Sequence, residues 1–116
     1  MNNLKYLDQV LCESLRLFPP VVTFTIREVD REIAVGSYTI PKGVSIFVPV
    51  WQIHHDPTLW PDPDRFDPGR FTAAARKEHH PMAWIPFGAG PRKCIGMRFA
   101  LLELKLCLAR IIRSFR

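Results

Sequence analysis

The sequence has few cysteines and no long hydrophobic run, and each of these shortages argues against a class of protein. Its 116 residues include three cysteines, an odd number without paired spacing, which argues against a disulfide framework and favours a reducing compartment. No apolar run approaches the about 20 residues that span a bilayer, so we expect no membrane anchor in this chain. Charged residues at positions 5, 8 and 13 interrupt the N-terminal apolar positions, which does not fit a signal peptide.

Acidic residues are outnumbered by basic ones. The chain carries 16 lysines and arginines against 11 aspartates and glutamates, a net charge of +5. A positive surface suits either nucleic acid or an acidic protein partner. No nucleic-acid-binding motif accompanies the charge, so we expect no nucleic-acid partner. The length suits one small domain, and 47% hydrophobic residues suffice for a modest core.

The most informative residue is Cys94, which lies in a stretch rich in glycine and proline directly before a helical pattern. Gly88 and Gly90 admit backbone angles that are closed to other residues, so the chain can curl tightly around a bulky ligand. The positive end of the following helix, with Arg92 and Lys93, favours a thiolate at Cys94.

A buried structural thiol is the alternative, because most free cysteines behave as small hydrophobic residues. The loop around Cys94 argues against that alternative there. Cys12 and Cys107 have no such loop, and we expect both in the core.

The stretch matches Phe-x-x-Gly-x-Arg-x-Cys-x-Gly at every fixed position and resembles the haem-binding loop of the cytochromes P450. The resemblance implies haem b as cofactor and Cys94 as the axial thiolate ligand of its iron. It also implies that Arg92 pairs with a haem propionate and that Phe87 packs beside the sulfur. The residues assigned to the cofactor on this basis are Phe87, Gly88, Arg92, Cys94 and Gly96.

Residues 3–18 have apolar side chains at three- to four-residue spacing, which predicts a helix that Asn2 or Asn3 caps and Pro19-Pro20 ends. Glu13 and Arg16 share one face of this helix. Taken alone they form a solvated surface pair. With their flanking residues they resemble the K helix of the P450 family, in which Glu-x-x-Arg is a signature.

In that family an arginine from a Pro-Glu-Arg-Phe motif completes a structural network with the glutamate and the first arginine. The matching stretch here is Pro68-Gly69-Arg70-Phe71, with Gly69 in the glutamate position. The resemblance therefore implies a Glu13–Arg16–Arg70 network that pins the proline-rich segment beneath the haem. Arg65, in the near-repeat Pro63-Asp64-Arg65-Phe66, is the alternative third member.

Residues 33–35 and 38–40 flank the turn dipeptide Gly36-Ser37, and residues 44–48 form a mostly apolar strand pattern that we expect to be buried. These segments predict a small antiparallel sheet similar to the one that follows the K helix in P450s. By the same alignment, residues 23–27 line the haem edge. Arg27 is then a candidate propionate ligand, with a plain surface arginine as the alternative.

Eight of the eleven prolines lie between residues 49 and 91, which predicts an extended meander with one short helix near its start. Residues 72–80 are expected to form an exposed loop. The histidine pairs at 54–55 and 79–80 have poor zinc-ligand spacing, so surface or hydrogen-bonded loop histidines are favoured.

Residues 96–116 carry one broad apolar stripe that predicts a second long helix, with core burial favoured over a helix zipper. It resembles the L helix of the family.

We therefore expect a mainly α fold with a small antiparallel β-sheet. The resemblance implies that residues 1–116 form a single partial domain, the C-terminal portion of the P450 fold: K helix, β hairpins, proline-rich meander, cysteine loop and L helix. The amino-acid sequence around Cys94 is most similar to that of animal microsomal members of the 3A and thromboxane-synthase type.

The resemblance implies a haem-thiolate monooxygenase that uses O2 and reductase-supplied electrons to oxidise apolar small molecules. NADPH–cytochrome P450 reductase or another electron donor would meet the basic face near Cys94, where Lys93 and Arg98 lie. The intact protein would reside in the endoplasmic reticulum membrane, held there by a region outside this chain. The alternatives are a haem isomerase that rearranges peroxides without a reductase, and a non-catalytic remnant that exposes its core faces.

Overall fold

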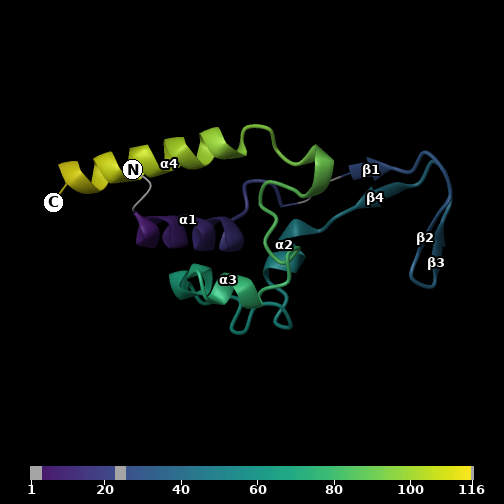
Figure 1. Ribbon diagram of the computed structural model, residues 1–116, viewed down its shortest axis with the longest axis horizontal. Helices are drawn as coiled ribbons and strands as arrows, with labels where there is room; N and C mark the ends of the chain where they lie inside the picture. Colours follow the sequence, from purple (N-terminus) through teal and green to yellow (C-terminus); the bar gives the residue numbers. More distant parts are fainter. Residues whose placement is uncertain (1–3, 23–25, 116) are drawn as a thin grey trace.

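The computed structural model of the protein describes residues 4–22 and 26–115. It is elongated, 56 × 29 × 21 Å, with two long helices side by side at one end and a β hairpin projecting at the other (Figure 1). The elements, in chain order, are α1 (Lys5–Leu17), β1 (Ile26–Glu28), β2 (Ile33–Val35), β3 (Tyr38–Ile40), β4 (Ser45–Phe47), α2 (Val50–His54), the 3₁₀ turn η1 (Pro68–Phe71), α3 (Ala75–Glu78), the 3₁₀ turn η2 (Gly90–Arg92) and α4 (Met97–Ser114).

Helix α1 follows the predicted apolar spacing and ends where the two prolines require it. Its last residue is Leu17, and the amide of Phe18 closes the final turn by donating to the Ser14 carbonyl at 2.8 Å. Leu4 holds the position before the helix and makes no side-chain capping hydrogen bond. Asn2 and Asn3, predicted as caps, lie outside the described residues.

The β structure consists of two separate antiparallel ribbons. β1 pairs with β4 and β2 pairs with β3, the latter around Gly36, whose φ of +61° suits glycine. The antiparallel hairpin is confirmed, but the expected burial of residues 44–48 is wrong, since the Phe47 side chain is 51% exposed. Among the described elements β4 packs only on β1, so no second layer covers the apolar side chains.

The core lies between α1 and the proline-rich segment. Trp60 is fully buried and packs with Phe71, their ring centroids 5.8 Å apart, next to Cys12 and Ala83. The indole nitrogen of Trp84 donates to the Cys12 carbonyl at 3.0 Å. This aromatic packing fixes the meander onto α1. The meander also contains η1 and α3, so the stretch predicted as one exposed loop at 72–80 includes a helical turn.

Helix α4 packs against α1 and buries none of its residues. The predicted core burial of its apolar stripe is therefore wrong, and so is the predicted core position of Cys107, which is exposed. The pattern identified a face that favours burial, but α1 covers only part of it.

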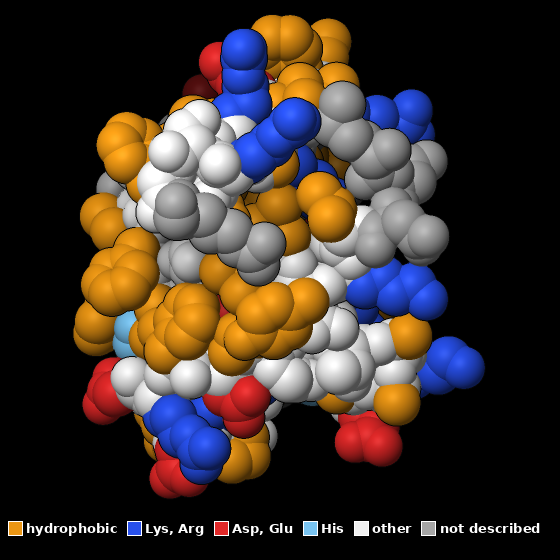
Figure 2. Space-filling model, turned by 90° about the vertical axis from the view of Figure 1, so that its left-hand side faces the viewer, with side chains coloured by type: hydrophobic (Ala, Val, Ile, Leu, Met, Phe, Trp, Pro, Cys, Tyr) orange, Lys and Arg blue, Asp and Glu red, His pale blue; other side chains and the backbone are white. Residues whose placement is uncertain are grey.

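Figure 2 shows hydrophobic side chains gathered at the end of the molecule where α1 and α4 meet, with lysines and arginines around them. A groove of about 680 Å³ runs between the two helices there, and its apolar lining comes from Leu4, Tyr6, Leu7, Val10, Ala109 and Ile112. Across residues 4–22 and 26–115, no helix combines the length and the apolar character needed to cross a membrane.

Candidate functional site

Residues 86–96, which we name the Cys94 loop, curl back on themselves before α4 begins. Gly88 and Gly90 take φ values of +72° and +73°, a region that favours glycine. The Cys94 amide donates to the Phe87 carbonyl at 2.8 Å, and this bond closes the loop. The predicted tight curl at the glycines is thus confirmed, and it leaves the Cys94 side chain exposed.

The Cys94 side chain faces a cavity of about 810 Å³. Apolar groups such as Val21, Ile26 and Phe87 form part of its wall, and the lining also carries three cationic side chains, those of Arg27, Arg92 and Lys93. No acidic side chain is among the described residues that line it. Small-molecule and cofactor sites typically enclose about 300–1,000 Å³, so the volume is suitable for a cofactor.

These lining groups fit a haem. A haem is a flat apolar macrocycle that carries two carboxylates and needs an axial ligand, and the cavity offers an apolar wall, cationic side chains and one thiol. The structure brings Phe87, Gly88, Arg92, Cys94 and Arg27 together around the cavity. Residues 23–25, also predicted at the haem edge, lie outside the described residues.

Gly96 has a different place from the other predicted cofactor residues. It is the residue before α4, and a Cβ atom there would lie 3.9 Å from the Cys94 sulfur, in ordinary van der Waals contact. Because Gly96 is two residues after Cys94, the N-terminus of α4 lies close to the thiol along the chain.

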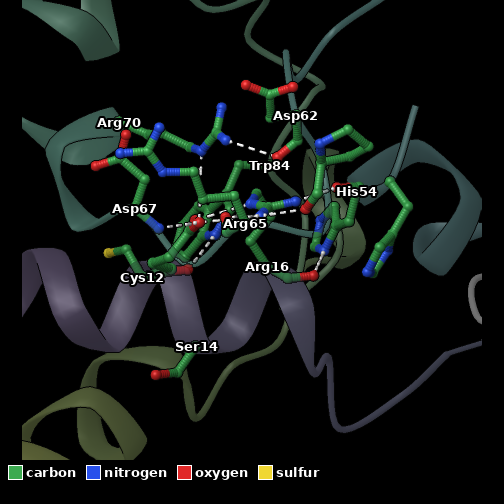
Figure 3. A network of polar contacts seen from close by, with 12 residues as sticks. Cys12, Ser14, Arg16, His54, Asp62, Arg65, Asp67, Arg70 and Trp84 are labelled. Carbon is green, nitrogen blue, oxygen red and sulfur yellow. Dashed lines mark hydrogen bonds and ion pairs between the residues drawn. The ribbon is translucent and has the colours of Figure 1, made fainter. Parts of the chain in front are cut away.

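A buried ion pair lies on α1, facing the proline-rich segment. Glu13 and Arg16 are both fully buried and pair bidentately, with Nε–Oε2 at 2.7 Å and Nη2–Oε1 at 2.9 Å (Figure 3). Arg16 also donates to the carbonyls of His54 and Pro63, both at 2.7 Å. The pair is therefore not a solvated surface contact. It connects α1 with α2 and the meander through charge-assisted bonds.

The structure brings Arg70, rather than Arg65, to this pair. The Nε atom of Arg70 lies 3.5 Å from Glu13 Oε1, and its Nη2 donates to the Asp62 carbonyl at 2.9 Å. Arg65 contributes only its backbone carbonyl, 3.4 Å from Arg16 Nη2. We refer to Glu13, Arg16 and Arg70 as the Glu13 network.

The glycine at position 69 is explained by the local turn. The Asp67 carboxylate accepts a hydrogen bond from the Gly69 amide at 2.9 Å, and the Asp67 amide donates to Glu13 Oε1 at 2.9 Å. A Cβ atom at position 69 would lie 2.9 Å from that carboxylate oxygen, so a larger residue would displace it. Asp67 thus supplies a carboxylate that caps η1 and, through its own amide, contacts the Glu13 network.

His54 is the site residue that the sequence did not reveal. Its side chain is fully buried, with Nδ1 3.1 Å from the Arg16 carbonyl oxygen and Nε2 2.9 Å from the Ile85 amide nitrogen. Burial lowers the pKa of His54 to about 4, and the positive charge of Arg16 adds to this effect. Val50, four residues earlier on α2, is also buried, but nothing in the local sequence distinguishes His54 from His55.

The three cysteines differ in accessibility, which gives a direct test of the structure. Burial raises the pKa of the Cys12 thiol, while Arg76, whose Nη2 lies 3.0 Å from the sulfur, opposes that shift. Cys94 and Cys107 are exposed.

A thiol-alkylating reagent added to the folded chain is expected to label Cys94 and Cys107 and to spare Cys12 until denaturant is added, as measured by peptide mass spectrometry. Early labelling of Cys12 would contradict the packing of α1 described above.

Comparison with known proteins gives a consistent result. The family model described as Cytochrome P450 matches residues 1–116. The chain is 50% identical over 115 residues to thromboxane-A synthase of Sus scrofa and 47% identical to the probable cytochrome P450 4s3 of Drosophila melanogaster. It is 42% identical to cytochrome P450 3A29 of Sus scrofa. Each match covers 99% of this chain but only 21%, 23% and 23% of the respective relative.

Proposed function

The chain belongs to the cytochrome P450 family, and we propose that it provides the haem-ligating part of a monooxygenase that oxidises apolar small molecules with O2. Haem b is the cofactor of that family. The observation that carries the proposal is the cavity at Cys94, which combines one exposed thiol, apolar walls and three cationic side chains. Since the chain spans about a fifth of the length of the relatives it matches, the activity is proposed for the protein that contains it.

Each lining residue has a role in this proposal. The haem, when bound, supplies oxygen activation, and a thiolate ligand favours that chemistry by donating electron density to the iron. Cys94 is the ligand, and Arg92 and Arg27 hold the two propionates through charge-assisted hydrogen bonds. Phe87, half-buried in the cavity wall, packs beside the sulfur. The Glu13 network holds the meander on α1 beneath the loop.

The electron donor in this proposal is an acidic partner such as NADPH–cytochrome P450 reductase. Lys93 and Arg98 are exposed on either side of Cys94, and Ile95 between them is fully exposed. Complementary charge would steer such a partner toward this face. The microsomal relatives support the endoplasmic reticulum membrane as the location of the intact protein.

A haem isomerase is the second candidate function. It is favoured by the 50% identity to a relative named thromboxane-A synthase. Such an enzyme would use the same Cys94 ligation but would rearrange a peroxide without reductase or electrons. A non-catalytic remnant is the third reading, and the exposed apolar face of α4 is what supports it.

Two measurements separate these functions. A reduced, CO-bound absorption spectrum of the haem-reconstituted chain is expected to show the red-shifted Soret band of thiolate-ligated haem. In the intact protein, product formation that requires NADPH and reductase would support the monooxygenase, whereas reductase-independent peroxide rearrangement would support the isomerase. If the red-shifted Soret band is absent from both the chain and the intact protein, the non-catalytic remnant is the one candidate that remains.

A further inference from the structure

His54 connects the Glu13 network with the segment that leads into the Cys94 loop. Its backbone carbonyl accepts a hydrogen bond from Arg16 Nη1 at 2.7 Å. Its ring contacts the Arg16 carbonyl through Nδ1 (Figure 3). Its Nε2 accepts a hydrogen bond from the Ile85 amide. The side chain therefore lies between α1 and residue 85 with no exposure to solvent.

The partners of the ring define its protonation state. A carbonyl oxygen only accepts hydrogen bonds, and a backbone N–H only donates them. The ring must then carry its proton on Nδ1 and leave the lone pair of Nε2 free for Ile85. Both contacts exist together only in this neutral form of His54.

Ile85 is the link from the ring to the cysteine. It is buried, and its carbonyl accepts the amide of Gly88 at 3.0 Å. That bond forms the first turn of the Cys94 loop, and the bond from Cys94 to Phe87 closes the loop. The position of Ile85 therefore sets where the loop begins and, through two hydrogen bonds, where the sulfur lies.

We propose that neutral His54 is a positioning residue for Cys94, holding the loop through Ile85 in the arrangement that ligates haem. The inference rests on the proposed function, because it assigns His54 a part in thiolate ligation. Protonation would place an N–H on Nε2 opposite the N–H of Ile85, and the contact would be lost.

Burial of the ring makes that protonation unfavourable near neutral pH, and the positive charge of Arg16 adds to this effect. Arg16 faces the ring from α1 with Glu13 paired to it, His55 is the residue after α2, and residues 83–85 carry no titratable side chain. His54 takes up its proton near pH 4 in the folded chain and near its ordinary pKa of about 6.5 when unfolded. Its stabilising contribution is therefore complete above about pH 6.5 and is lost as the pH falls toward about 4.

Substitution of His54 by asparagine and by glutamine tests the two ring contacts separately. Asparagine places a donor near the Nδ1 position but does not reach Ile85, whereas glutamine places an acceptor near the Nε2 position and does not titrate. His55→Asn is the matched control, because the His55 ring contacts Trp51, stacking on its indole and lying with Nδ1 2.9 Å from its carbonyl oxygen, and makes no hydrogen bond to Arg16 or Ile85 among the described residues. The first readout is deuterium exchange at the Ile85 amide in the haem-free chain. The second is the fraction of thiolate-ligated haem against pH.

In His54→Asn, we expect Ile85 exchange about 10- to 100-fold faster than in the parent, corresponding to one lost buried hydrogen bond, together with loss of thiolate ligation at pH 7. His54→Gln is expected to keep slow exchange and thiolate ligation, and to lack the parent's decline between about pH 6.5 and 4. His55→Asn should behave as the parent.

The outcomes distinguish this proposal from the proposed function. Suppose that the parent ligates haem as a thiolate. Unchanged Ile85 exchange in His54→Asn would then overturn the positioning role alone. A His54→Gln variant that is as impaired as His54→Asn would do the same. A parent that never ligates haem as a thiolate, while Ile85 exchange still follows residue 54, would overturn the proposed function and reduce His54 to a structural anchor. Because glutamine retains the Ile85 contact, the test holds even where the asparagine variant does not fold.

Discussion

Replacing Cys94 by serine is expected to abolish thiolate ligation of haem completely while leaving the fold unchanged. In the proposed site the Cys94 thiolate binds the iron, and a neutral hydroxyl is a poor substitute. The Cys94 side chain is exposed, and the bond that closes the loop comes from its backbone amide, which serine keeps. The reduced, CO-bound spectrum should lose its red-shifted band entirely, with a stability change within about 0.5 kcal/mol.

Cys107→Ser is the matched control for this experiment. Cys107 is also exposed, but it lies on α4 and does not line the Cys94 cavity. Its substitution should leave the spectrum as in the parent. A red-shifted band that persists in Cys94→Ser would show that another residue ligates the iron, and the assignment of the cavity would then be wrong.

Replacing Glu13 by alanine is expected to destabilise the chain by about 3–5 kcal/mol, because it leaves the fully buried guanidinium of Arg16 without its counter-charge. Small domains are stable by only about 5–15 kcal/mol, so the loss is a large part of the total. It also removes the acceptor of the Asp67 amide. Urea unfolding should show a much lower midpoint, and haem retention should fall with it.

Two other substitutions measure how much of this effect is specific to the buried pair. Asp8→Ala removes an α1 carboxylate that pairs with Arg76 and Lys105 in a half-exposed place, and should cost about 1 kcal/mol or less. Arg70→Ala should cost less than Glu13→Ala, since Arg70 Nε has no hydrogen-bond partner among the described residues and lies 3.5 Å from Glu13. Equal losses for Asp8 and Glu13 would contradict the role of burial.

Local chemistry allowed several features to be predicted from the sequence. Two prolines end α1 because they exclude helix before and within themselves, and Gly88 and Gly90 are placed where the backbone has positive φ. The association of Glu13 with Arg16 follows from helical spacing alone. The choice of Arg70 over Arg65 does not, because it depends on how Asp67 turns the chain at η1.

Burial was the quantity that local patterns could not determine. An amphipathic pattern shows which face of a helix favours an apolar contact, not which element supplies it. No residue of the α4 stripe or of the strand at 44–48 is therefore fully buried. Conversely, the adjacent residues His54 and His55 look alike in the sequence, yet the first is fully buried and the second is not, because only His54 faces α1 and residue 85.

The one-sided packing of α4 has a consequence for how the protein opens. The stable core lies on the other side of α1, among Cys12, Trp60, Phe71 and Ala83, and α4 contributes nothing to it. We therefore expect the helix to unfold as a separate cooperative unit, at a lower free-energy cost than the core. Because Cys94 lies three residues before the helix begins, fraying of this unit would release the loop from one end while the bond between His54 and Ile85 still holds the other.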